Sequence, residues 1–263
     1  MRSLITCILF IFIPSSAIAQ ITDAAIAEAF WEWEKSAPPS SSEAEALSRY
    51  RLKLKKDGLT DAAIEDTLVR LKREALRQEG EFYDSIYAKG TKSALGPNKL
   101  LVEAVRGRKP GSALDVAMGQ GRNSVYLANL GWTVTGFDIS KVGLQQANTK
   151  AKAEGVVIRT VLTGDEDFDF GYEKWDLIAI IYALEKRSVR RARQALKPGG
   201  IVVVESGHKD ASGAPFEYET GELQKIFEGF QILRAEKITE KGDWGEKPYP
   251  LVRIIAQKPS RTR

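Results

Sequence analysis

Residues suited to binding a ligand cluster between positions 115 and 138. Asp115 ends an apolar run, Gly119 and Gly121 follow it one residue apart, and Asp138 ends the next apolar run in "GWTVTGFDIS". Glycines in such a loop let the backbone approach a ligand and let a helix amino terminus face it. A carboxylate at the end of a strand accepts hydrogen bonds from both hydroxyls of a ribose. The pattern therefore predicts a site for an adenosine-bearing ligand.

A dinucleotide-binding loop is the first alternative. That loop requires Gly-x-Gly-x-x-Gly, but Ser124 occupies the third position here, which disfavours a nicotinamide-dependent oxidoreductase. A further acidic segment, "TGDEDFDF", follows a third apolar run. In an adenosine site, Asp165 or Glu166 would accept a hydrogen bond from the adenine amino group, and Phe168 would pack on the base.

The elements that must position these residues alternate between strands and helices. This order predicts an α/β fold with a doubly wound, Rossmann-like, mostly parallel seven-stranded sheet, covered by helices on both faces. The expected strands are 113–117, 133–138, 156–162, 175–183, 200–206, 230–239 and 251–259, and the expected helices are 123–130, 141–154, 188–196 and 221–227. The last two strands are joined without a helix, so we expect an antiparallel strand at one edge.

Three helices are expected before this alternation begins. They start near Thr22, at 43–56 and from Thr60 toward Glu79, and a Pro/Ser linker at 36–42 separates the first two. We therefore predict an N-terminal helical segment at 20–90 and the strand–helix domain at 91–263.

The first 19 residues have the features of a secretory signal peptide. Arg2 precedes the apolar residues 4–13, and Ala-Ile-Ala at 17–19 forms a small-residue cleavage site. Pro14 interrupts the apolar run well short of the roughly 20 residues that cross a bilayer. We expect an exported protein, periplasmic or secreted, with no stable membrane anchor after cleavage; the protein would be cytoplasmic if the signal is not used.

The glycine loop, the two strand-end aspartates and the acidic segment follow one another in an order that resembles the motifs of the class I S-adenosylmethionine-dependent methyltransferases. The first motif corresponds to Asp115, Ala117, Gly119 and Gly121, with alanine in place of the family's first glycine. "GQGRNSVYLA" and "GWTVTGFDIS" look closest to the tellurite-resistance-type branch, and "LKPGG" at 196–200 resembles the turn before the family's fifth strand. The resemblance spans about 97–259 and implies S-adenosyl-L-methionine as cofactor. The cofactor-binding residues that it implies are Asp115, Ala117, Gly119, Gly121, Asp138, Ile139, Asp165, Glu166 and Phe168.

The resemblance also implies in-line transfer of a methyl group from a sulfonium to an acceptor. Such an enzyme mainly aligns donor and acceptor, and it needs a base only if the nucleophile arrives protonated. Candidate catalytic residues stand at strand ends or in the segment that covers the cofactor: Tyr83, Tyr87, Tyr182, Glu205 and His208. Four of these residues also have a structural interpretation. Tyr83 and Tyr87 would pack in a lid, Glu205 would form a salt bridge, and His208 would lie on the surface.

Absent residues narrow the class of acceptor. The sole cysteine, Cys7, lies in the signal segment, so the mature chain offers no thiolate nucleophile. One histidine and no compact pair of carboxylates argue against a catalytic metal. The 39 basic and 35 acidic residues are interspersed, and the basic segment 186–197 lacks aromatic residues, so we interpret it as a solvated helix rather than a nucleic-acid surface. We expect a small-molecule methyl acceptor; the alternative is an exported binding or interaction protein on a methyltransferase-like scaffold.

Overall fold

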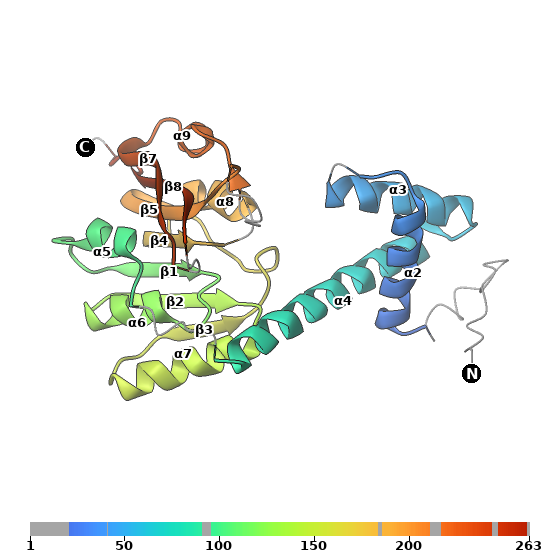
Figure 1. Ribbon diagram of the computed structural model, residues 1–263, viewed down its shortest axis with the longest axis horizontal. Coiled ribbons are helices and arrows are strands. Elements are labelled where there is room, and N and C mark those ends of the chain that lie inside the picture. Colours follow the sequence, from blue (N-terminus) through green and yellow to red (C-terminus); the bar gives the residue numbers. More distant parts are fainter. Residues whose placement is uncertain are drawn as a thin grey trace. The chain divides into compact units, whose positions relative to one another are not determined.

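The computed structural model describes residues 21–40, 42–90, 96–183, 186–210, 217–243 and 247–261 (Figure 1). The predicted signal segment, 1–19, lies outside the described residues. The chain divides into two compact units, Met1–Glu79 and Gly80–Arg263. Within the described part, no helix combines the length and the apolar character needed to cross a membrane.

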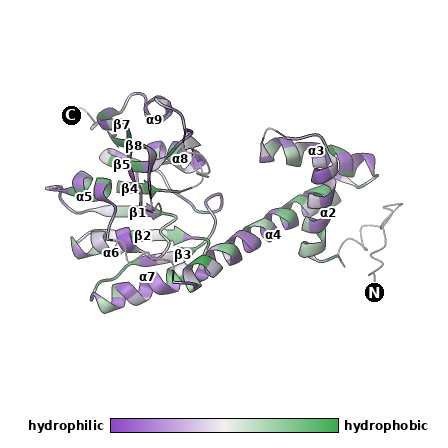
Figure 2. Cartoon of the chain, viewed as in Figure 1, coloured by the Kyte–Doolittle hydropathy of each residue, from purple (hydrophilic) through white to green (hydrophobic). Residues whose placement is uncertain are grey.

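The first unit contains the predicted helices. They are α2 (Asp23–Ser36), α3 (Glu43–Lys56) and the beginning of α4 (Asp61–Ala88). Thr22 and Ser42 cap α2 and α3, since their side chains accept hydrogen bonds from backbone N–H groups in the first turn. Buried apolar side chains from all three helices form a small core: Ile26, Phe30, Tyr50, Leu54, Ile64 and Leu71. Hydrophilic and hydrophobic residues alternate along α4, as expected for an amphipathic helix (Figure 2).

Helix α4 is longer than the sequence indicates. The expected end was near Glu79, where Gly80 follows, but the helix continues to Ala88. A Cβ on Gly80 would lie 3.0 Å from the backbone oxygen of Ile139, so glycine here permits close packing of α4 on the loop after the second strand. The last turns of α4 are therefore part of the second unit.

The second unit is the predicted doubly wound sheet. Its strands follow the order β3-β2-β1-β4-β5-β8-β7, with the short β6 pairing with the end of β5. The bounds are β1 Ser112–Val116, β2 Thr133–Asp138, β3 Arg159–Leu162, β4 Trp175–Ile181, β5 Leu196–His208, β6 Glu217–Tyr218, β7 Gln231–Lys241 and β8 Pro248–Gln257. Strands β1 to β5 are parallel, and β8 runs antiparallel to both β5 and β7. The prediction of a mostly parallel sheet with an antiparallel strand near one edge is confirmed.

Helices cover both faces of this sheet, and each face has its own core (Figure 1). The first face packs against α5 (Lys99–Val105), α6 (Arg122–Asn129) and α7 (Lys141–Ala153), and the second against α8 (Lys186–Ala195) and α9 (Glu222–Ile226). Strand order reverses beside β1, because β2 lies on one side of it and β4 on the other. In doubly wound sheets a ligand binds at this point, outside the carboxyl ends of the strands.

Strand β5 extends beyond its predicted bounds at both ends. Leu196 already pairs with Trp175 of β4, and pairing with β8 continues as far as Gly207 opposite Leu251. His208 therefore lies within the strand rather than after it, and Glu205 lies inside the strand as its predicted bounds imply.

Candidate functional site

The loop between β1 and α6 adopts the left-handed backbone conformation at alternate residues. The φ angles are 52° at Ala117, 53° at Gly119 and 72° at Gly121. This region is readily open to glycine but costs an L-residue roughly 1–2 kcal/mol. Ala117, where the resembled family has glycine, therefore holds a strained conformation. Met118 fixes the loop to the neighbouring strand, since its N–H donates to the backbone oxygen of Phe137 at 3.0 Å.

Both glycines of the loop also lie against other elements. A Cβ on Gly119 would stand 2.6 Å from the hydroxyl oxygen of Tyr87, and one on Gly121 would stand 2.7 Å from Cβ of Ala147. The sequence predicted glycines for backbone approach to a ligand. The structure adds a second reason, because α4 and α7 pack directly on this loop.

Asp138 ends β2 directly beside this loop. Its Oδ1 accepts the Ser140 N–H at 2.8 Å and its Oδ2 accepts the Gly119 N–H at 2.7 Å. Only 5% of the residue is exposed, and burial raises the pKa of the carboxyl group, while the backbone N–H groups favour its ionised form. A carboxylate has about four acceptor positions, more than these backbone groups use, so it can also accept from a ligand hydroxyl. The residue fits a ribose at this place.

Asp115 has a different environment. It is 1% exposed, and its Oδ2 accepts the Ser124 hydroxyl at 2.7 Å. Burial raises its pKa to about 6, and the Ser124 hydrogen bond opposes that rise. Ser124, which stands in place of the third dinucleotide-loop glycine, thus connects α6 to β1. In this structure Asp115 stabilises the start of the loop through its hydrogen bond with Ser124.

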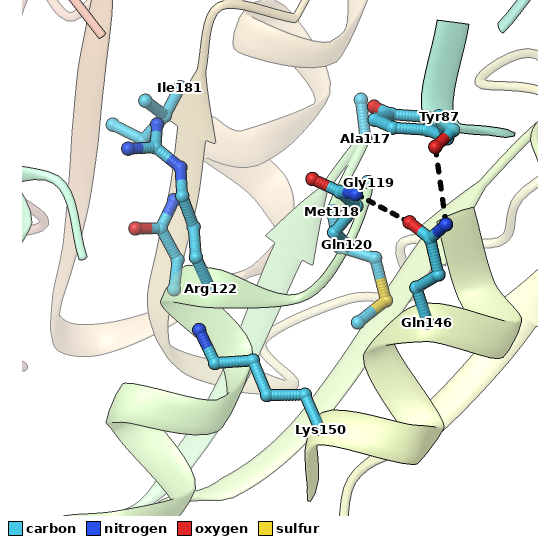
Figure 3. Close-up of a pocket in the computed structure, with 10 residues that line it drawn as sticks. Tyr87, Ala117, Met118, Gly119, Gln120, Arg122, Gln146, Lys150 and Ile181 are labelled. Carbon is cyan, nitrogen blue, oxygen red and sulfur yellow. Dashed lines mark hydrogen bonds between the residues drawn. The ribbon is translucent and has the colours of Figure 1, made fainter. Parts of the chain in front are cut away.

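A cavity of about 290 Å³ opens beside the glycine loop (Figure 3). The predicted residues that line it are Tyr87, Ala117 and Gly119. The sequence reasoning missed the others: Met118, Gln120, Arg122, Asn123, Gln146, Lys150 and Ile181. Four of these belong to "MGQGRN", the loop that had been singled out. Gln146 and Lys150 lie one turn apart on α7, and only the packing of that helix brings them to the loop.

The end of α4 forms one wall of the cavity. Tyr87 is buried there, and the Tyr83 ring stacks on it with the ring centres 6.5 Å apart. Burial raises the pKa of Tyr87 well above its usual range, so its hydroxyl stays protonated at neutral pH. The carboxylate of Asp84 accepts the Ser140 hydroxyl at 2.5 Å and the Val142 N–H at 2.9 Å. Asp84 thereby caps α7 immediately after Asp138.

The acidic segment after β3, for which adenine contacts are predicted, makes contacts with α8. The carboxylate of Asp165 accepts a hydrogen bond from Ser188, and Glu166 forms an ion pair with Arg187. Phe168 is 8% exposed, and its ring stacks on Phe137 at 4.2 Å between centroids. None of the three lines the cavity.

Helix α8 itself is less solvated than predicted. Arg191 donates to the backbone oxygens of Asp165, at 2.6 Å, and Phe168, and Arg193 donates to those of Ile226 and Glu228. These guanidinium groups are hydrogen-bonded within the protein because they satisfy loop carbonyls. The interpretation of a solvated helix is therefore corrected for Arg191 and Arg193, while Arg187 and Arg190 are exposed.

Two other predicted catalytic residues belong to a network of charged and polar groups at the ends of β4 and β5. Glu205 is buried in an ion pair with Arg253 and accepts the Asn98 amide at 2.7 Å. The alternative of a salt-bridged glutamate is the one that the structure contains. Tyr182 has a φ of 57°, its hydroxyl accepts the Asp243 N–H at 3.3 Å, and burial raises its pKa.

His208 is buried, and it does not line the cavity. It is 2% exposed, so the expected surface position is corrected. Its Nε2 lies 2.9 Å from the Thr220 hydroxyl oxygen, and its Nδ1 accepts the Asp210 N–H at 3.1 Å. Both ring nitrogens are therefore engaged. Among the described residues, no group of three or more His, Cys, Asp or Glu side chains is arranged to hold a metal ion.

Part of this unit is similar to known methyltransferases. Residues 113–200 match the family described as a methyltransferase domain. Thiopurine S-methyltransferase of Vibrio cholerae is 24% identical over 143 residues, which cover 46% of this chain and 66% of that protein. Ribosomal RNA small subunit methyltransferase C of Alcanivorax borkumensis is 28% identical over 142 residues, which cover 49% of this chain and 42% of that protein. The chain thus spans less than two thirds of the length of these relatives.

The fold agrees with that of solved structures. TehB from Haemophilus influenzae superposes with a TM-score of 0.52 at 21% sequence identity, covering 60% of this chain and 61% of that one. At this identity the likeness shows the fold alone. The match over residues 113–200 and the shared fold therefore support a class I S-adenosylmethionine-dependent methyltransferase.

Proposed function

We propose that the protein transfers a methyl group from S-adenosylmethionine to a small-molecule acceptor. The observation that carries this proposal is the placement of Asp138 beside the N–H of Gly119, at the point where strand order reverses. A carboxylate with spare acceptor positions and a closely packed glycine loop are suited to the ribose and methionine parts of the cofactor.

The chain's own residues would bind and orient the reactants. When bound, the cofactor supplies an electrophilic methyl group on its sulfonium. Asp138 would hold the ribose hydroxyls, and the loop at 117–121 would form the floor under the methionine part. Tyr87 would close the wall of the cavity opposite α6. Alignment of this kind lowers the barrier by holding donor and acceptor in near-attack geometry.

The predicted bases are poorly placed to remove a proton. Tyr87 and Tyr182 stay protonated because burial raises their pKa values, Glu205 is paired with Arg253, and both ring nitrogens of His208 are engaged. We therefore infer an acceptor that arrives as a competent nucleophile, such as a thiolate, an amine or a soft anion, and needs no general base.

The hydrogen bonds of the basic helix support a small molecule rather than a nucleic acid as acceptor. The relatives include one named for thiopurine and one for ribosomal RNA, so the family leaves this choice open. In this chain, Arg191 and Arg193 of the basic helix donate to internal carbonyl oxygens. Phosphate contacts from these two arginines would have to replace those hydrogen bonds.

The test is a survey of methyl acceptors. The purified protein is incubated with methyl-labelled S-adenosylmethionine and a metabolite extract, and products that gain the label are identified by mass spectrometry. We expect labelled small molecules with the natural protein and none with Asp138→Ala. Label that enters only RNA or protein would contradict the small-molecule proposal, and label that enters nothing would favour a binding protein on this scaffold.

We also propose that the protein is exported. The support is the charged start, apolar core and Ala-Ile-Ala site within residues 1–19. Amino-terminal sequencing of the native protein should begin at Gln20. A native protein that begins at Met1 would contradict export by this signal.

A further inference from the structure

Arg122, the first residue of α6, lines the cavity on the side of β4. Its side chain lies on the same side of the cavity as Ile181, the last residue of β4, and on the far side from Tyr87 (Figure 3). A long charged side chain has many rotamers, so it keeps one place in a wall only when its partners hold it there. The partners of Arg122 therefore set the shape of this side of the cavity.

Arg122 has a charged partner, Asp243. The guanidinium forms an ion pair with the Asp243 carboxylate, and only 12% of the arginine side chain and 19% of the aspartate side chain are exposed. The guanidinium also donates to the backbone oxygen of Gly96 at 3.3 Å, which is a longer and uncharged contact. In a largely buried ion pair, removal of one partner leaves the other charge uncompensated. The position of Arg122 therefore depends on Asp243.

Asp243 is itself held by contacts outside the cavity lining. It follows Gly242 and β7, and its N–H donates to the Tyr182 hydroxyl at 3.3 Å. A Cβ on Gly242 would lie 2.8 Å from the same hydroxyl oxygen and would overlap the hydroxyl of Tyr249, so glycine permits this close approach. Tyr182 has a φ of 57°, and strained residues of this kind are concentrated at functional sites.

Asn98 connects the same carboxylate to the next residue of α6. The side chain is buried, and its amide donates to Asp243 at 2.9 Å and to Glu205 at 2.7 Å. The backbone N–H of Asn98 donates to Oδ1 of Asn123 at 2.9 Å. Both Arg122 and Asn123 line the cavity. The first two residues of α6 are thus tied to one polar network, one through Asp243 and the other through Asn98.

Stability alone accounts poorly for this ion pair. Loss of hydration offsets most of the attraction in a buried pair, and apolar residues of similar size often stabilise a protein as well. The two partners here are 121 residues apart in the sequence, and one of them is a cavity-lining residue. Placing a side chain accurately in the wall of a ligand site is a reason to retain such a pair.

We propose that Asp243 is a positioning residue, which holds the Arg122 side chain as the wall on the β4 side of the cavity. Docking of the residues after β7 thereby sets the shape of the ligand site. Asp243 does not line the cavity and acts through Arg122. The inference rests on the proposed function for the identity of the ligand that Arg122 would face.

The first measurement is the affinity for S-adenosylhomocysteine, determined by calorimetry. Asp243→Ala removes the counter-charge and should weaken binding about fivefold, because the guanidinium leaves the wall to regain hydration. Asp243→Asn keeps an oxygen that accepts from Arg122 and from the Asn98 amide but carries no charge, so it should recover part of the loss.

Glu240→Ala is the matched control. Glu240 lies near the end of β7 and also forms an ion pair, with Arg253, which keeps Glu205 and Glu236 as partners. Neither Glu240 nor Arg253 lines the cavity. The control variant should bind S-adenosylhomocysteine with the affinity of the natural protein.

A double-mutant cycle separates positioning from a general loss of stability. Arg122→Met removes the guanidinium, and in that background Asp243→Ala should cause no further loss of affinity. Thermal melting checks that each variant is folded, and Asp243→Asn replaces Asp243→Ala if the latter is not. Equal affinity in the natural protein and Asp243→Ala, or the same fold-loss in both backgrounds, would overturn the proposal.

A measurement without ligand keeps this test apart from the proposed function. Hydrogen exchange is followed in the first turn of α6, where the Val125 N–H donates to the Gly121 oxygen at 2.8 Å. Exchange there should be severalfold faster in Asp243→Ala than in Glu240→Ala, because the start of the helix has lost its anchor. If the natural protein binds no S-adenosylhomocysteine, the proposed function fails. Equal exchange in the two variants would then overturn the positioning role as well, and faster exchange in Asp243→Ala would support it.

Discussion

Two buried aspartates at neighbouring strand ends have different tasks. Asp138 accepts two backbone N–H groups and keeps acceptor positions for a ligand, whereas Asp115 contacts Ser124 and is sealed behind the loop. The sequence identified both, because an acid at the end of an apolar run is a strong local signal. It did not separate their roles, since these depend on whether α6 covers the carboxylate.

The raised pKa of Asp115 predicts a pH-dependent stability. Its carboxyl group has a pKa of about 6 in the folded protein against a usual value of 3.8. The folded state therefore binds the proton more tightly than the unfolded state. This contribution to stability is present below about pH 4 and is lost as the pH rises through about 6, up to about 3 kcal/mol.

Asp115→Asn removes this titration and keeps an oxygen to accept the Ser124 hydroxyl. Denaturant unfolding at several pH values should show the natural protein losing stability relative to the variant between about pH 4 and pH 6. A difference that stays constant over this interval would show that Asp115 titrates normally.

Gly119 is limited by Tyr87 as well as by its backbone. In Gly119→Ala, the new Cβ would lie 2.6 Å from the Tyr87 hydroxyl oxygen at a φ of 53°, so we expect a loss of about 1–3 kcal/mol in the free energy of unfolding. Tyr87→Phe removes that oxygen, and the same glycine change should then cost less in a double-mutant cycle.

Gly107→Ala is the matched control for this change. Gly107 has a φ of 71° and nothing within 4 Å of the added Cβ, so only the backbone cost remains. Equal losses for the two glycines in the natural background would show that contact with Tyr87 is unimportant.

At the scale of elements, the end of α4 is part of the site. Residues 80–88 contact Ile139, Ser140, Val142 and Gly119 through Gly80, Asp84 and Tyr87. The alternation of strands and helices was predictable, because each apolar run and each amphipathic stretch is a pattern within a few neighbouring residues. The extension of α4 was not, since Gly80 usually indicates the end of a helix and here permits close packing.

The cap that Asp84 forms on α7 gives a test of this role. Asp84→Ala removes the acceptor for the Ser140 hydroxyl and the Val142 N–H, and should cost about 1 kcal/mol of stability. Because Ser140 also donates its N–H to Asp138, we expect weaker S-adenosylhomocysteine binding as well. Asp84→Asn keeps one oxygen and should recover part of both losses. Unchanged affinity in Asp84→Ala would separate α4 from the ligand site.

At the scale of the whole molecule, the boundary between the two compact units falls within α4, between Glu79 and Gly80. The sequence placed the boundary after residue 90, at the change from helical to alternating patterns. Local patterns report where element types change, whereas a unit boundary depends on which residues pack together. Gln146 and Lys150 were not predicted as lining residues for the same reason. Only the packing of α7 against the loop brings them to the cavity.

Two truncated chains test this boundary. A chain of residues 80–263 keeps Asp84 and Tyr87, so it should fold and bind S-adenosylhomocysteine with an affinity close to that of the full chain. A chain of residues 91–263 lacks both residues and should bind more weakly and melt at a lower temperature. Equal binding by the two truncated chains would refute the assignment of residues 80–88 to the site.

The central claim is that Asp138 and the adjoining glycine loop bind the cofactor. Calorimetric titration of S-adenosylhomocysteine into the natural protein and into Asp138→Ala tests it most directly. We expect binding to the natural protein and a loss of at least about tenfold in the variant, because two charge-assisted hydrogen bonds to the ribose disappear. Equal affinity in both proteins, or no binding to the natural protein at millimolar ligand, would contradict the account.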